Sequence, residues 1–141
     1  MTDTSTDAPI RLVPEGMEQD GPMFGLVPGL RTGDLIFVSG QLGIEEDGTI
    51  PADGARQSEL AFEALRRVLA EGGAALADIV HLQTFHKGGM AVTNEWFLPV
   101  KARYLPAPFP TWTGVGVADL GGEGALIEIG AVARVSSRSP R

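Results

Sequence analysis

Residues 53–87 read DGARQSELAFEALRRVLAEGGAALADIVHLQTFHK and contain the two elements that decide the fold. The first part lacks proline, and its apolar residues recur at helical spacing on one face: Leu60, Ala61, Ala64, Leu65, Val68 and Leu69. Asp53 is a suitable N-cap, and Gly72-Gly73 is a suitable stop. Residues 79–87 are dense in Ile, Val, Leu, Thr and Phe over the length of one strand. The stretch therefore predicts an amphipathic helix followed by a strand.

The residues before this helix predict a pair of strands. Two short apolar runs, 23–27 and 35–38, are separated by the turn formers Pro28-Gly29 and Gly33-Asp34. This spacing predicts an antiparallel hairpin. Residues 39–41, Ser-Gly-Gln, end the second strand, and an acidic loop follows before the helix.

The residues after the strand predict one more helix and two more strands. Apolar residues at helical spacing predict a helix over 94–104 with Thr93 as its cap, in which Pro99 either kinks the helix or shifts its start. The proline-rich residues 105–110 predict an extended connection. Residues 111–118 and 125–135 are then two strands, joined by the glycine-rich residues 120–124.

The element order β-β-α-β-α-β-β predicts an α+β fold in which one mixed sheet carries both helices on a single face. The length of 141 residues suits a single domain, which we place at residues 11–135, between a flexible lead-in, 1–10, and a loose tail, 136–141. The strands carry apolar residues for both faces of the sheet, and no third helix is expected to cover the second face. We therefore expect the chain to associate with copies of itself through that face.

Composition narrows the chemistry. The sequence has no cysteine and only two histidines, which excludes thiolate catalysis and leaves little for a zinc site. A net charge of −7 disfavours binding to nucleic acid, because the phosphate backbone dominates that affinity. The chain lacks an apolar stretch long enough to cross a bilayer, and its first residues are polar and acidic rather than basic and then apolar. We expect a cytoplasmic protein with no membrane partner.

Standard catalytic motifs such as GxSxG and HExxH are absent, but a series of short runs resembles one known family. These runs are Gly21-Pro22, residues 35–41 (LIFVSGQ), the helix ending at Gly72-Gly73 with Asp78-Ile79-Val80 after it, residues 84–87 (TFHK), residues 106–111 (PAPFPT) and residues 126–133 (LIEIGAVA). In this order and spacing, from about residue 21 to residue 135, they resemble the Rid family. That family is also called the YjgF or reactive intermediate/imine deaminase family, and it has carried the name endoribonuclease.

The resemblance implies a chorismate-mutase-like fold that forms a homotrimer with ligand clefts between neighbouring subunits. Members of its best-known branch hydrolyse enamines and imines to 2-keto acids and ammonia. They use no cofactor and no metal, so the resemblance implies none here. A small-molecule ligand is the expected partner.

Two departures from that branch affect the expected ligand. The branch has a Pro-x-Arg-Ser motif whose arginine holds a substrate carboxylate, whereas this chain has Trp112 at the arginine position. An indole offers one hydrogen-bond donor and no charge. Met23 likewise replaces a tyrosine of the branch. We expect a preference for neutral or aromatic ligands over small carboxylates.

The resemblance also assigns candidate site residues. Glu128 stands where the family activates water, which makes it the first candidate for acid–base catalysis. His86 is the second, because an unperturbed imidazole has a pKa near neutral pH. Trp112, Ser39, Met23, Asn94 and Gly114 are the expected ligand-binding residues.

Each of these assignments has a plainer alternative. Glu128 could form an ion pair across the trimer, Trp112 could fill the core, and His86 could be hydrogen-bonded without taking part in chemistry. His81 ranks below His86. At the level of function, the chain is either a cofactor-free hydrolase of a reactive imine, enamine or carbonyl compound, or a protein that binds or senses a small molecule in the same cleft.

Overall fold

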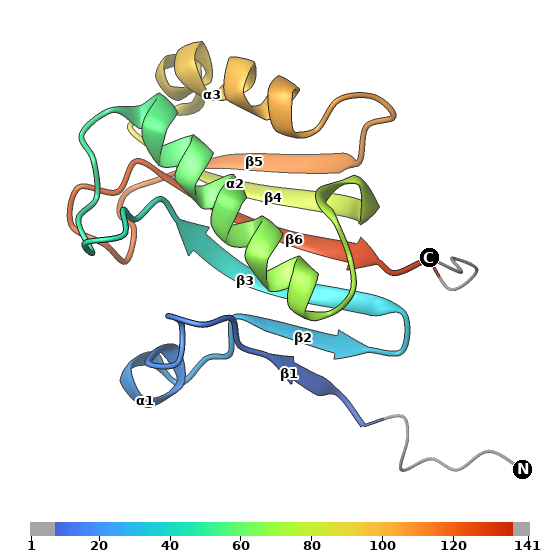
Figure 1. Ribbon diagram of the computed structural model, residues 1–141. Coiled ribbons are helices and arrows are strands. Elements are labelled where there is room, and N and C mark those ends of the chain that lie inside the picture. Colours follow the sequence, from blue (N-terminus) through green and yellow to red (C-terminus); the bar gives the residue numbers. More distant parts are fainter. Residues whose placement is uncertain (1–7, 137–141) are drawn as a thin grey trace, which may run out of the picture.

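The computed structural model describes residues 8–136, so most of the expected lead-in and tail lies outside the described residues. The elements are β1 (Ile10–Leu12), α1 (Asp20–Phe24), β2 (Gly29–Thr32), β3 (Leu35–Leu42), α2 (Gly54–Glu71), the short 3-10 helix η2 (Leu76–Asp78), β4 (Ile79–Lys87), α3 (Met90–Tyr104), β5 (Thr111–Val117) and β6 (Ile127–Arg134). In Figure 1, α2 crosses the strands diagonally and α3 lies above β5 at the top of the view. Ile10, the last residue of the expected lead-in, already belongs to β1.

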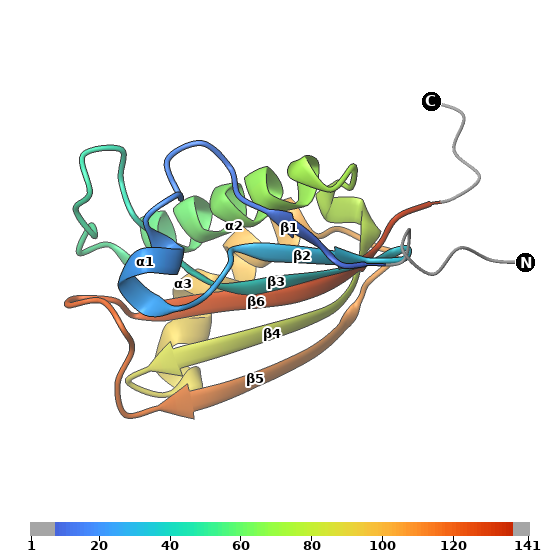
Figure 2. The ribbon, with the colours of Figure 1, turned by 90° about the horizontal axis from the view of Figure 1, so that it is seen from below.

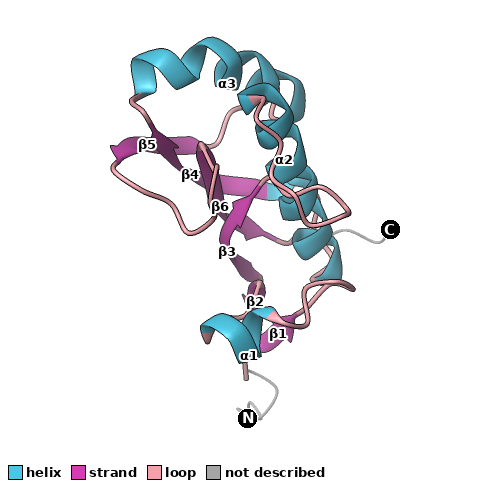
Figure 3. Cartoon of the chain, turned by 90° about the vertical axis from the view of Figure 1, so that its left-hand side faces the viewer, coloured by secondary structure: helices cyan, strands magenta, loops and turns pink. Residues whose placement is uncertain are grey.

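The strands form one six-stranded mixed sheet in the order β1-β2-β3-β6-β4-β5 (Figure 2). The pair β4–β5 is parallel, and the other four neighbouring pairs are antiparallel. Figure 3 shows α2 and α3 on the same side of this sheet. The predicted α+β architecture with two helices on one face is confirmed. We call the side covered by α2 and α3 the helix face and the other side the open face.

Helix α2 has the N-cap and the buried apolar face that its sequence predicts. Asp53 has extended backbone angles, and its side chain accepts a hydrogen bond from the backbone N–H of Ala55 at 3.3 Å, as an N-cap does. The apolar face of α2 is fully buried against the sheet through Ala61, Phe62, Leu65, Val68 and Leu69. The helix ends at Glu71 with Gly72 as its C-cap, and Gly73 follows with a φ of +84°.

The second strand of the predicted hairpin begins at the predicted residue but continues through residues 39–41, which were expected to end it, as far as Leu42, where it still pairs with β6. The first strand was predicted wrongly. Residues 23–27 are not a strand, because α1 occupies residues 20–24 and ends at Gly25, whose φ of +71° stops the helix. The first strand of the hairpin is instead β2, and the connection to β3 uses the second turn signal, Gly33-Asp34.

Helix α3 begins at Met90, one turn earlier than the predicted residue 94. Gly88 and Gly89 both have a positive φ and make the sharp connection that allows the early start. Thr93 therefore lies inside the first turn, where its hydroxyl donates to the Gly89 carbonyl at 3.1 Å. Pro99 lies inside the helix and does not set its start, which is Met90.

The last two strands lie where they were predicted, within two residues at each end, but they are not neighbours. Strand β4 lies between β5 and β6 and pairs with both. No helix in the described residues is long and apolar enough to cross a membrane.

Candidate functional site

Cross-strand pairs determine which side chains share a face of the sheet. Between β4 and β6, Phe85 pairs with Glu128 and His86 pairs with Ile127. Ile127 is fully buried beneath the helices, so His86 points to the helix face. Because successive side chains of a strand alternate, Phe85 and Glu128 point to the open face.

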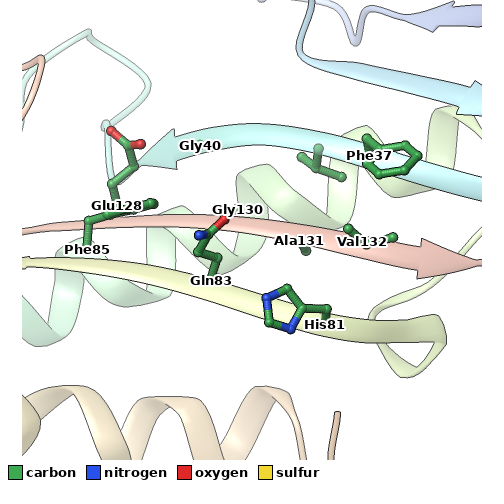
Figure 4. Close-up of a pocket in the computed structure, with 10 residues that line it drawn as sticks. Phe37, Gly40, His81, Gln83, Phe85, Glu128, Gly130, Ala131 and Val132 are labelled. Carbon is green, nitrogen blue, oxygen red and sulfur yellow. The ribbon is translucent and has the colours of Figure 1, made fainter. Parts of the chain in front are cut away.

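A hollow of about 320 Å³ lies on the open face over β3, β6 and β4 (Figure 4). It is lined by two phenylalanines, three polar side chains and five glycine or smaller apolar residues. The lining residues are Phe37, Val38, Gly40, His81, Gln83, Phe85, Glu128, Gly130, Ala131 and Val132. The predicted catalytic residue Glu128 therefore lies in a hollow large enough for a small molecule.

Glu128 occupies space that a glycine provides. A Cβ atom at Gly40 would lie 2.6 Å from the Glu128 carboxyl carbon, closer than atoms can approach. Among the described residues the Glu128 side chain has no hydrogen-bond or ion-pair partner. Burial raises the pKa of Glu128 above its ordinary value, because a charged carboxylate is poorly solvated there. Such a carboxyl is suited to giving and taking back a proton near neutral pH.

His86 lies on the other side of the sheet and is fully buried. Its Nδ1 lies 2.8 Å from the Thr93 hydroxyl oxygen, and its Nε2 lies 2.7 Å from the Thr84 hydroxyl oxygen. The Thr93 hydroxyl gives its proton to the Gly89 carbonyl, so the imidazole must donate from Nδ1 and accept at Nε2. Burial lowers the pKa of His86 and favours this neutral form. Both ring nitrogens are used within the fold, which is the plainer alternative considered for this residue.

Trp112 also lies on the helix face, because it pairs with the buried Leu82. Its indole N–H donates to the Thr84 hydroxyl at 2.8 Å, and its ring is tilted against Phe97 with centroids 6.1 Å apart. The Lys101 ammonium lies 4.6 Å from the centre of the indole. Trp112 is half-buried, so it packs against the core and keeps an exposed edge.

The other predicted ligand-binding residues are dispersed. Gly114 lies beside Thr84, and a Cβ there would come within 2.8 Å of the Met90 methyl group. Ser39 donates its hydroxyl proton to the Val27 carbonyl at 2.7 Å. Met23 is 66% exposed on α1. Asn94, on α3, has a buried side-chain oxygen with no hydrogen-bond partner among the described residues.

One chain therefore does not bring the predicted site residues into one cleft. Glu128 is on the open face, whereas His86, Trp112 and Gly114 are on the helix face. Gln83 and Phe85 line the hollow but were not predicted from the sequence, and His81, which also lines it, ranked below His86. The signal was available, because alternation along residues 79–87 separates positions 81, 83 and 85 from positions 82, 84 and 86.

The described residues offer no group of three or more histidine and carboxylate side chains that could hold a metal ion. The hollow itself contains one carboxylate and one imidazole. Glu128 pairs with Phe85 at one end of the hollow, and His81 pairs with Val132 at the other. The carboxylate and the imidazole are therefore too far apart to bind one metal ion together.

The family model described as Endoribonuclease L-PSP matches residues 19–135. The chain belongs to this family, the Rid or YjgF family. It is 40% identical over 113 residues to the RutC family protein YjgH of Escherichia coli. The aligned residues cover 75% of this chain and 79% of YjgH. It is also 29% identical over 128 residues to the 3-aminoacrylate deaminase RutC of Acinetobacter baylyi, covering 88% of this chain and 96% of RutC.

Solved structures of Rid-family members have the same fold. The structure of protein YjgH matches with a TM-score of 0.80 and 35% identity over 92% of this chain and 98% of that one. Escherichia coli TdcF with bound serine matches with a TM-score of 0.67 and 30% identity, covering 79% of this chain and 88% of TdcF. The resemblance to the Rid family and the chorismate-mutase-like fold are thereby confirmed.

Proposed function

We propose that the chain is a cofactor-free hydrolase that acts on a small enamine, imine or comparably reactive carbonyl compound, with Glu128 as its proton-transfer group. The observation that carries the proposal is the unpartnered, half-buried carboxyl of Glu128 in a hollow lined by phenylalanine and glycine. The named activity of the relative RutC, deamination of 3-aminoacrylate, is a reaction of the same class.

The chemistry needs one group that both gives and takes a proton. Protonated Glu128 would give its proton to the enamine carbon while the nitrogen lone pair forms a C=N⁺ bond. Water would then add to the iminium carbon and lose a proton to the Glu128 carboxylate. Transfer of that proton to nitrogen and cleavage of the C–N bond would then release ammonia. The hydroxyl proton would return to the Glu128 carboxylate as the carbonyl forms. In sum, enamine and water give carbonyl compound and ammonia, and Glu128 returns to its starting state.

We further propose that the complete cleft lies between subunits of a homotrimer. Glu128 and Trp112 lie on opposite faces of one sheet, so a single ligand can meet both only if two chains contribute. Strand β5, which carries Trp112, is at the edge of the sheet and is available to a neighbour. An alternative role for Glu128, an ion pair with a lysine or arginine of the neighbour, would quench its acid–base function.

We propose that the preferred substrate, unlike 2-aminoacrylate, carries no free carboxylate. The position of the carboxylate-binding arginine holds Trp112, and the hollow has no lysine or arginine among its lining residues. A free carboxylate would meet like charge once Glu128 has given up its proton, without a compensating cation. An uncharged enamine or imine avoids that repulsion.

The second candidate is a protein that binds or senses a small molecule without turning it over. This candidate is favoured because the His86 ring nitrogens and the Trp112 N–H form hydrogen bonds within the fold. Of the predicted site residues, Glu128 is then the one candidate left to transfer a proton. Ammonia release discriminates between the two. The assay uses 2-aminoacrylate or 2-aminocrotonate formed in place by a serine/threonine dehydratase, and the stable neutral enamine 3-aminocrotonamide. Release above the buffer rate from any of them supports the hydrolase, and binding without release from all three supports the second candidate.

We also propose that nucleic acid is not the substrate, although the family model carries a ribonuclease name. The chain has a net charge of −7, and among the described residues that line the hollow Glu128 is the one carboxylate, with no lysine or arginine beside it. Neither a basic groove nor a stacking platform with cationic neighbours is available there. Salt-sensitive RNA cleavage that purifies with the protein and disappears in Glu128→Ala would overturn this proposal.

A further inference from the structure

The hollow extends along β4 well beyond Glu128. Phe85 pairs with Glu128, Gln83 pairs with Gly130, and His81 pairs with Val132. At about 3.3 Å per residue, His81 lies roughly 13 Å along the strand from the Glu128 end. Figure 4 shows Gln83 between the two, with its side chain in the hollow. The rest of a ligand whose reacting group lies at Glu128 can therefore contact the polar side chains of Gln83 and His81.

The hydrogen bonds of His81 fix which ring nitrogen is free. Its Nδ1 lies 2.8 Å from the Thr111 hydroxyl oxygen, and that hydroxyl donates its only proton to the Val80 carbonyl at 3.0 Å. The imidazole must therefore be the donor at Nδ1, and in the neutral ring this leaves an acceptor lone pair at Nε2. Figure 4 shows the ring with its other nitrogen turned along β4 toward Gln83. The far end of the hollow thus presents a hydrogen-bond acceptor.

Gln83 provides a carboxamide at the middle of the hollow. Its side chain has no hydrogen-bond partner among the described residues, so both its N–H₂ group and its oxygen are available. The backbone opposite is Gly130, which has no side chain to cover the amide. Phe37 and Phe85 supply apolar walls. No lining residue is lysine or arginine, so the path offers hydrogen bonds and apolar surface rather than a countercharge for an anion.

We propose that Gln83 and His81 are specificity-determining residues of this site, and that they select an uncharged, elongated substrate that carries an amide-like N–H group beyond its reacting carbon. Gln83 holds the nearer amide, and the free Nε2 of His81 accepts from an N–H at the far end. This inference rests on the proposed function for the identity of the reacting end, but its test measures binding and does not depend on turnover.

The test uses three ligands that share the carbonyl end of the expected product. Acetoacetamide is short and neutral, acetoacetate is its anionic counterpart, and N-acetoacetylglycinamide is neutral and longer. Calorimetry with the wild-type protein should show both amides binding more tightly than acetoacetate. Gln83→Leu should weaken both amides about two- to tenfold, the effect of losing one or two hydrogen bonds. His81→Phe should weaken only the longer amide.

Matched variants separate specificity from damage to the fold. Gln19→Leu makes the same chemical change at an exposed position outside the hollow and should leave all three affinities unchanged. His81→Gln restores an acceptor and should recover part of the binding of the longer amide. Wild-type protein that binds acetoacetate as tightly as the amides, or a His81→Phe variant with unchanged preference, would overturn the inference. A wild-type protein that binds the amides but releases no ammonia would refute the proposed function and leave this inference supported.

Discussion

Gly40 and Glu128 show how one missing side chain can place a functional group. The Glu128 carboxyl lies where a Cβ of residue 40 would be, with 2.6 Å between that atom and the Glu128 carboxyl carbon. Because the displaced atoms are the far end of a flexible side chain, Gly40→Ala should move the carboxyl and leave the backbone in place. We expect ammonia release to fall at least about tenfold, in line with the rate share of a positioned acid–base group, with little change in melting temperature. Unchanged turnover in Gly40→Ala would show that the position of Glu128 in the hollow does not matter.

The raised pKa of Glu128 predicts a pH-dependent cost to stability. A carboxyl whose pKa is higher in the folded state binds its proton more tightly there, so its contribution to stability is complete below the ordinary value of 4.5 and is lost as the pH rises through the folded pKa. Glu128→Gln removes this cost. Its melting temperature relative to wild type should therefore increase from pH 4 to pH 8 in differential scanning fluorimetry. A difference that stays constant over this range would contradict the burial of the charge.

The sequence indicated which residues are candidates for the site better than it indicated what their side chains contact. Glu128 was identified by resemblance, and it does line a hollow. His86 and Trp112 were expected in the same cleft, yet their polar atoms are joined through Thr84 on the helix face. Hydrogen bonds between residues far apart in sequence decide such roles, and spacing along the chain does not encode them.

At the scale of elements, the close approach of α2 to the end of β3 depends on Gly43. A Cβ at Gly43 would lie 2.6 Å from the Cα of Gln57, so backbone would have to move against backbone. Gly43→Ala should lower the free energy of unfolding by about 1–3 kcal/mol, as overpacking does. Gly121→Ala is the matched control, because a Cβ there meets nothing within 4 Å. Equal stability of the two variants in urea unfolding would show that this contact is not tight.

The chain Trp112–Thr84–His86–Thr93 links β5, β4 and α3 through buried hydrogen bonds of 2.7–2.8 Å. Protonated His86 would need a second acceptor at Nε2, where Thr84 now donates. A histidine with a lowered folded pKa costs stability as the pH falls below its ordinary value of 6.5, because only the unfolded chain takes up the proton there. His86→Gln should therefore lose less stability than wild type between pH 7 and pH 5. An equal loss in both proteins would assign the acid sensitivity to other groups.

Elements with a strong period were predicted with their correct bounds, and those with competing turn signals were not. The strand 79–87 and the helix capped by Asp53 agree with β4 and α2. The region 20–33 contains glycines at 21, 25, 29 and 33, and the sequence does not say which of them makes a turn. Gly25 and Gly33 have a positive φ, whereas Gly29 lies in β2 under Val68. The packing of Gly29 against α2 therefore determines that residue 29 lies in a strand rather than in a turn.

At the scale of the whole molecule, the open face leads us to expect a trimer. Val115 on this face lies on the edge strand β5, outside the hollow, and is 41% exposed in the single chain. Sedimentation should give a mass of three times 14.8 kDa, because a closed ring can bury the same face of each member. Val115→Asp should dissociate the assembly, whereas Val92→Asp, at an exposed position on α3, should not. A folded monomer at micromolar concentration would contradict the shared cleft.

The most direct measurement is the rate of ammonia release by Glu128→Gln relative to wild type, with 3-aminocrotonamide and dehydratase-generated 2-aminocrotonate as substrates. Glutamine keeps the shape of the side chain and cannot exchange a proton, so kcat should fall by about a hundredfold or more on whichever substrate the wild type turns over, while the fold and the mass of the assembly stay the same. Glu128→Asp, which keeps the carboxyl, should retain part of the rate. A Glu128→Gln variant that releases ammonia within about threefold of the wild-type rate, far inside the range expected for a lost acid–base group, would contradict the central claim.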